Sequence, residues 1–92
     1  MRKFKDKCFV NLDWIIDRLN EENLKQIKKW GIQNRSAFEW MTYTVEELGE
    51  LAEAISECEY RGGSTGKIIS EAFQVATLTL KIAEMYLTQG VR

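Results

Sequence analysis

Three glutamates with helical spacing are the residues of this chain best suited to chemistry. Glu47 and Glu50 lie three positions apart in the segment V-E-E-L-G-E-L-A-E-A-I, and Glu71 lies in the later segment I-I-S-E-A-F-Q-V-A. Residues three apart occupy neighbouring faces of a helix, so the first two carboxylates can converge on one hard cation. A charge that points into an apolar interior is costly unless a partner or a metal compensates it. The pattern therefore indicates a cation site.

A helical wheel separates two of these glutamates from ordinary surface charges. Four glutamates of the second predicted helix align within about 60° and form a solvated acidic face: Glu46, Glu50, Glu53 and Glu57. Glu47 lies about 100° from Glu46, at the margin of the apolar arc, and Glu71 lies inside an apolar arc of about 240° on the third predicted helix. A buried ion pair between Glu71 and a lysine or arginine is one explanation. A metal shared by Glu47, Glu50 and Glu71 explains more, because it accounts for acids on both helices.

The amino-acid composition limits which metal could bind and which catalytic mechanisms are possible. The chain contains no histidine, and its two cysteines, Cys8 and Cys58, are far apart. Cys/His zinc sites and histidine-activated nucleophiles are thereby excluded. Carboxylate ligands favour Mg²⁺, with Mn²⁺ as an alternative, and Mg²⁺ held in this way usually keeps coordination positions for water and substrate phosphates.

Capping and glycine signals divide the 92 residues into three helical segments. The predicted helices cover about residues 12–30, 37–61 and 67–89. Asn11 is the expected N-cap of the first helix, Ser36 and Glu39 form a capping box before the second, and Gly90 ends the third. No segment alternates with the period of a strand. We therefore predict an all-α fold with two long antiparallel helices in a helical bundle, preceded by one further helix.

The chain is short enough to form one domain over residues 1–92, and its apolar faces are wide. Six residues of the first helix form one apolar stripe: Leu12, Ile15, Ile16, Leu19, Ile27 and Trp30. Asn23 falls within this stripe and is expected to be a hydrogen-bonded core residue. The apolar arc of the third helix is wider than one neighbouring helix can cover. We therefore expect oligomerisation to complete the bundle, as a homodimer or a tetramer.

Charge and hydropathy point to a small protein of the cytoplasm. The net charge is −1, and the only basic cluster lies within residues 2–7, without the aromatic interleaving of a nucleic-acid-binding arm. No segment has the apolar core of a signal peptide or the length of a membrane span. We expect no nucleic-acid partner, no membrane association and a reducing, cytoplasmic location.

These residues resemble the MazG-like, all-α nucleoside triphosphate pyrophosphohydrolases. That family carries E-x-x-E on one helix and E-x-x-D on the next. Glu47 to Glu50 match the first half within E-E-L-G-E-L-A-E-A-I, and Glu71 begins the second half, in which Gln74 replaces the final aspartate. The resemblance covers roughly residues 30–86, so it implies a MazG-like helical domain.

The resemblance implies Mg²⁺-dependent hydrolysis of a nucleoside triphosphate to the monophosphate and pyrophosphate, a reaction that clears surplus or non-standard nucleotides. It implies three groups of site residues. The expected metal ligands are Glu47, Glu50, Glu71 and Gln74. The expected catalytic carboxylates are Glu46, Glu47 and Glu50, one of which orients the attacking water. The expected substrate contacts are Gln33 and Asn34, in the polar segment before the second helix, and Trp40, as a stacking partner for the base.

The departure at Gln74 leaves two functions of the same fold open. A glutamine can bind a cation through its carbonyl oxygen but supplies no charge, so the affinity for Mg²⁺ should fall. The chain is then either an active pyrophosphohydrolase or a catalytically weak module that binds and senses a nucleotide. A structural helical bundle with solvated acids is a third interpretation, and the position of Glu71 within the apolar arc argues against it.

Overall fold

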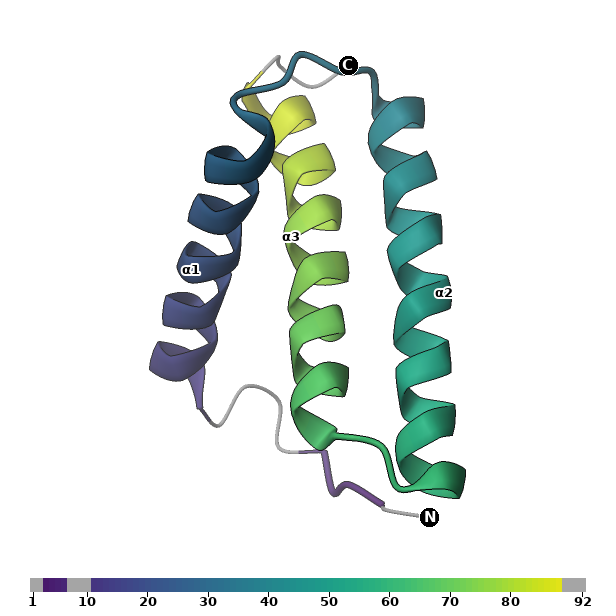
Figure 1. Ribbon diagram of the computed structural model, residues 1–92. Helices are drawn as coiled ribbons and strands as arrows, with labels where there is room; N and C mark the ends of the chain where they lie inside the picture. The colour runs from purple at the N-terminus through teal and green to yellow at the C-terminus, as the bar shows by residue number, and fades with distance from the viewer. Residues whose placement is uncertain (1–2, 7–10, 89–92) are drawn as a thin grey trace.

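A computed structural model describes residues 3–6 and 11–88. The chain forms three α-helices, α1 (Leu12–Trp30), α2 (Ala37–Arg61) and α3 (Thr65–Thr88), and the described residues contain no strand (Figure 1). The predicted all-α fold is therefore confirmed. The expected end of the third helix at Gly90 lies outside the described residues. Within the described part of the chain, no helix combines the length and apolarity needed to cross a membrane.

Local signals fix both ends of α2. The Ser36 hydroxyl accepts a hydrogen bond from the Glu39 backbone N–H at 3.1 Å, and Glu39 Oε1 accepts one from the Ser36 N–H at 3.0 Å. The predicted capping box is thus present and satisfies two donors that a helix N-terminus leaves unpaired. Gly62 ends the helix with a φ of 72°, a left-handed conformation that glycine adopts without a Cβ clash.

The starts of the other two helices differ in detail from the prediction. The third helix begins at Thr65, two residues earlier than expected, because the Ser64 hydroxyl accepts a hydrogen bond from the Gly66 N–H at 3.0 Å. The first helix follows Asn11 as predicted, but the Asn11 side chain makes no capping hydrogen bond.

The helix α3 lies between the other two and contacts both. It packs along α2, whereas α1 contacts α3 but not α2 (Figure 1). At the α1–α3 contact, the Trp14 ring meets the Phe73 ring edge-to-face with centroids 5.5 Å apart, and the Arg18 guanidinium lies 5.1 Å from the same centroid.

The buried face of α1 is polar, which corrects the predicted packing of its apolar stripe. The buried residues of α1 are Glu22 and Gln26, while Ile16, Ile27 and other members of the stripe are exposed. Asn23 is only half-buried rather than a core residue. Hydrogen bonds explain the difference, because Gln26 accepts one from Lys81 of α3 at 2.6 Å and donates one to Glu22 at 3.1 Å.

The apolar core of the described chain is small. Among its hydrophobic residues, only Ala54 and Leu78 are buried. The buried polar residues are Glu22, Gln26, Thr44, Glu71 and Thr77. Many large apolar side chains on all three helices remain exposed. Completion of the core by a second copy stays a prediction.

Removal of the capping box should destabilise the protein. We expect Ser36→Ala to lower the free energy of unfolding by about 1 kcal/mol and the melting temperature by about 4–8 °C, because the Glu39 N–H loses its acceptor. Thermal unfolding at fixed protein concentration measures the change. The control is Ser56→Ala, an exposed position in the middle of α2, which should not lower the melting temperature. Equal effects at both positions would contradict the assignment.

Candidate functional site

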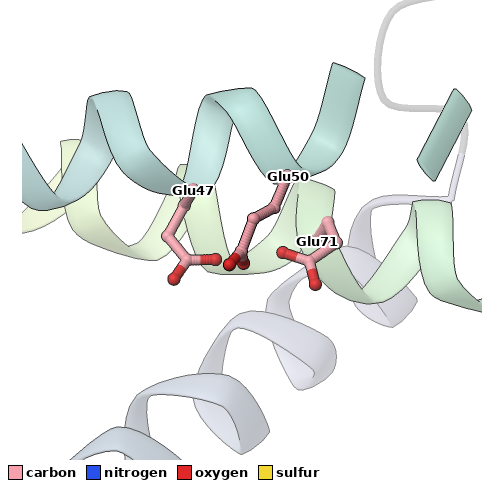
Figure 2. A group of neighbouring side chains, drawn as sticks. All are labelled: Glu47, Glu50 and Glu71. Atoms are coloured by element: carbon pink, nitrogen blue, oxygen red, sulfur yellow. The ribbon is translucent and has the colours of Figure 1, made fainter. Parts of the chain in front are cut away.

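Three carboxylates converge where α2 packs on α3. Glu47 and Glu50 project from α2 and Glu71 from α3, and one oxygen of each lies within 4.8 Å of the others (Figure 2). Glu50 is exposed, Glu47 is half-buried and Glu71 is only 9 % exposed. The structure therefore brings together the three glutamates that the sequence singled out, with Glu71 inside the apolar arc as expected.

Two oxygens of this cluster are buried without a partner. Glu47 Oε2 and Glu71 Oε2 accept no hydrogen bond from any described residue. The ion pairs found within residues 3–6 and 11–88 involve other glutamates, at positions 21, 39 and 57. The buried ion pair considered for Glu71 is therefore absent from the described part of the chain, and the negative charge lacks compensation there.

The proximity of the carboxylates changes their acidity. Burial, followed by the neighbouring carboxylates of Glu71 and Glu50, raises the pKa of Glu47 from its ordinary value of 4.5 to about 7. Proton uptake by Glu47 is one way to relieve the repulsion, and a cation between the three groups is another. Near neutral pH, a proton and a cation therefore compete for the same carboxylate oxygens.

The cluster fits a hard divalent cation. Its three donors are carboxylate oxygens, the ligands that Mg²⁺ and Mn²⁺ prefer. Oxygens that share one Mg²⁺ at about 2.1 Å lie within about 4.2 Å of each other, close to the spacing found here. Glu50 is exposed, so a cation held by the three glutamates would be accessible to solvent or to a substrate.

A cleft of about 1020 Å³ extends from the cluster toward the segment that joins α1 to α2. Its walls come from the apolar stripe of α1, the first half of α2 and the second half of α3. Glu47 belongs both to the cluster and to the cleft lining, so it links the two. A cavity of this size can hold a ligand as large as a nucleotide.

Two cations lie against aromatic rings in this cleft. The Lys81 ammonium is 5.3 Å from the Trp40 ring centroid, and the Arg35 guanidinium is 5.0 Å from that of Tyr43. Arg35 also donates a hydrogen bond to Gln33 Oε1 at 3.0 Å. Burial lowers the pKa of Lys81. The negative charge of nearby Glu22 has the smaller, opposite effect of raising it. The cleft thus combines positive charge and aromatic surface beside an acidic cluster.

The other residues expected at the site fall around this cleft. Glu46 and Asn34 line it and are exposed, whereas Gln33, Trp40 and Gln74 line it and are half-buried. Gln74 shares the cleft wall with Glu47, and the carboxylate cluster is formed without it. Its role as a metal ligand therefore stays a prediction.

Sequence reasoning missed Lys81 and Gln26 as residues of the cleft. Gln26 lies 55 positions before Lys81, and the hydrogen bond between them depends on how α1 packs on α3. The only local signal was a lysine placed among the apolar residues of α3. Arg35 follows Gln33 and Asn34 in the polar segment before α2, and nothing in the sequence pattern indicates its contact with Tyr43.

Comparisons with known proteins do not identify a family. The chain matches no protein-family model, no curated protein and no solved structure at a significant level. The resemblance to MazG-like enzymes therefore depends on the sequence pattern, and the functional argument depends on the geometry of the site.

The acidity of Glu47 predicts how stability changes with pH. Without divalent ions, the melting temperature should fall as the pH rises from about 5 to about 8. The raised pKa of Glu47 means that the folded state binds more protons than the unfolded state between 4.5 and about 7, so folding is favoured at low pH. Mg²⁺ should raise the melting temperature more at pH 8 than at pH 5.

The matched variant for this experiment is Glu47→Gln, which removes the titrating group. It should flatten the pH dependence and weaken the response to Mg²⁺ in thermal unfolding scans. A wild-type melting temperature that is unaffected by Mg²⁺ at either pH would argue against a cation site.

Proposed function

We propose that this protein is a Mg²⁺-dependent nucleoside triphosphate pyrophosphohydrolase, with Mn²⁺ as an alternative cofactor. The observation that carries the proposal is the buried, unpaired oxygen of Glu71 beside Glu47 and Glu50, at the end of a cleft that contains cations and aromatic rings. A cation site next to a nucleotide-sized cleft favours chemistry on a phosphate chain. The E-x-x-E motif agrees with this reaction, whereas the second motif departs from the family pattern at Gln74.

Glu47, Glu50 and Glu71 would hold the metal, with Gln74 as a neutral fourth ligand. Bound there, a divalent ion supplies positive charge to the phosphates and lowers the pKa of a water molecule. Glu46 is exposed on the cleft wall and adjacent in sequence to Glu47, so its carboxylate is free to accept a proton from the attacking water.

The remaining residues of the cleft suit the two ends of a nucleotide. Lys81 and Arg35 offer positive charge to the phosphates. The faces of Trp40 and Tyr43 offer stacking surface to a base, and Gln33 and Asn34 carry amides that can hydrogen-bond to its polar edge. In this arrangement the phosphate chain would point toward Glu47.

The decisive experiment is a screen for pyrophosphate release. Purified protein is incubated with a panel of standard and modified nucleoside triphosphates, with and without Mg²⁺. We expect metal-dependent release of pyrophosphate and a monophosphate from at least one substrate. Tight nucleotide binding without turnover would instead favour the sensing module, the alternative raised by Gln74. No binding and no turnover across the panel would refute the proposal.

Neutralising Glu71 should separate metal binding from folding. We expect Glu71→Gln to abolish pyrophosphate release and to weaken Mg²⁺ binding at least about tenfold, because the site loses a charged ligand. The melting temperature without metal should be unchanged or higher, because a buried uncompensated charge is removed. Calorimetric Mg²⁺ titration and thermal unfolding measure both effects.

The control is Glu53→Gln, an exposed carboxylate on the same helix as Glu47 that lies outside the cluster. It should retain Mg²⁺ binding and activity. If Glu71→Gln unfolds the protein while Glu53→Gln does not, Glu71 is a structural residue and the site is wrongly assigned.

Restoring a carboxylate at position 74 should strengthen the site. We expect Gln74→Asp to bind Mg²⁺ more tightly and to raise the rate of pyrophosphate release, because a charged oxygen attracts Mg²⁺ more strongly than an amide carbonyl does. Activity measured over a Mg²⁺ titration tests this. An unchanged metal dependence would place Gln74 outside the metal's ligands. Tighter Mg²⁺ binding with loss of nucleotide binding would instead make Gln74 a phosphate contact.

A further inference from the structure

Three hydrogen-bonded side chains lead from the buried face of α1 into the cleft. Glu22 and Gln26 are only 6 % and 7 % exposed, although both are polar. Glu22 Oε2 accepts a hydrogen bond from Gln26 Nε2 at 3.1 Å, and Gln26 Oε1 accepts one from Lys81 Nζ at 2.6 Å. An ionised carboxylate only accepts hydrogen bonds and an ammonium only donates them, so the two partners fix the orientation of the Gln26 amide.

The direct partners of the Lys81 ammonium are neutral groups. Besides the Gln26 amide, it meets the Trp40 ring, whose centroid lies 5.3 Å away. In the part of the chain that the structure describes, no carboxylate forms an ion pair with Lys81. An amide oxygen and a ring face stabilise an ammonium without cancelling its charge. Lys81 lines the cleft, so this charge is available to an anion there.

The guanidinium that also lines the cleft is less available to a ligand. Arg35 forms an ion pair with Glu39 at 3.5 Å and donates a hydrogen bond to Gln33 at 3.0 Å. The carboxylate of Glu39 compensates part of its positive charge. Lys81 is therefore the cation of the cleft that is better suited to attract a phosphate group.

Glu22 acts on Lys81 from behind the Gln26 amide. Burial lowers the pKa of Lys81, and the negative charge of Glu22 raises it. Other carboxylates line the same cleft, namely Glu46 and Glu47 of α2 and Glu84 of α3. A carboxylate placed one side chain away favours the protonated lysine and leaves the ammonium unpaired. A direct ion pair would favour the protonated form as well, but it would compete with an anionic ligand.

We propose that Gln26 and Glu22 are positioning residues that hold Lys81 in the cleft as a phosphate-binding cation. Gln26 directs the ammonium, and Glu22 fixes Gln26 and supplies negative charge. The phosphate ligand rests on the proposed function, whereas all three residues lie outside the carboxylate cluster. The docking of α1 on α3 thereby determines where positive charge is presented to the phosphates.

Calorimetric titration of the full chain with inorganic triphosphate and Mg²⁺ tests this role. We expect Lys81→Met to weaken binding at least about tenfold, because a charge-assisted hydrogen bond is lost. Gln26→Met keeps the approximate size of the side chain and should weaken binding at least about fivefold. The matched control is Lys67→Met, an exposed lysine on α3 outside the cleft, which should bind triphosphate like the wild type.

A double variant separates positioning from an independent structural effect. If Gln26 acts through Lys81, the protein with both Gln26→Met and Lys81→Met binds triphosphate about as weakly as Lys81→Met alone. Losses of affinity that multiply in the double variant would refute the positioning role. Wild-type affinity in Gln26→Met, or no binding of triphosphate by the wild type, would refute it too.

Glu22→Gln covers the case in which Gln26→Met does not fold. Its amide oxygen can still accept the hydrogen bond from Gln26, while the charge is removed. We expect triphosphate binding to weaken and the pKa of Lys81, followed by NMR of its ε carbon, to fall. The matched control is Glu21→Gln, the exposed neighbour on α1, which should change neither. An unchanged pKa of Lys81 in Glu22→Gln would overturn the role of Glu22.

These results are independent of the enzymatic screen. Triphosphate binding that depends on Lys81 and Gln26 supports the positioning role whether or not a nucleoside triphosphate is hydrolysed. Turnover in the screen together with unchanged triphosphate binding in Lys81→Met and Gln26→Met would refute the positioning role and leave the proposed function intact.

Discussion

Three carboxylates repel one another where α2 packs on α3, and both helices must be held together against this repulsion. Glu47, Glu50 and Glu71 approach within 4.8 Å, and two of their oxygens are buried without a partner among the described residues. Packing of α2 on α3 must oppose this repulsion with a small core, since Ala54 and Leu78 are the only buried apolar residues among those that the structure describes. A divalent cation would turn the same contact into an attraction, which couples metal binding to the stability of the helix pair.

Both a ring contact between Trp14 and Phe73 and buried polar contacts hold α1 against α3. Lys81 of α3 reaches Gln26 on α1 through a hydrogen bond and lies over the ring of Trp40 on α2. One lysine thereby contacts all three helices near the middle of the cleft. Because the buried face of α1 satisfies these polar groups, its apolar stripe is left to line the open cleft. An apolar wall beside fixed cations suits a ligand with both a ring system and negative charge.

The sides of helix α2 differ in the residues they carry and in how far these are buried. The side toward α3 carries Trp40 and Glu47, which face the cleft and the cluster. Another side carries large apolar residues that remain exposed, among them Met41, Val45 and Leu48.

The features that could be predicted from the sequence depend on interactions between residues close together in the chain. The capping box at Ser36 and the stop at Gly62 involve hydrogen bonds and backbone angles within a few positions, so local pattern predicts them. The burial of Glu71 could be predicted because it lies well inside the wide apolar arc of the third helix. Small errors in its angular position on a helical wheel do not move it out of that arc. Only the tertiary structure decided which face of α1 would pack, because an amphipathic stripe does not specify its partner and the buried hydrogen bonds of Gln26 favoured the polar face. The distances between Glu71 and the glutamates of α2 were likewise set by the packing of one helix on another, since no spacing within a helix fixes a separation across two.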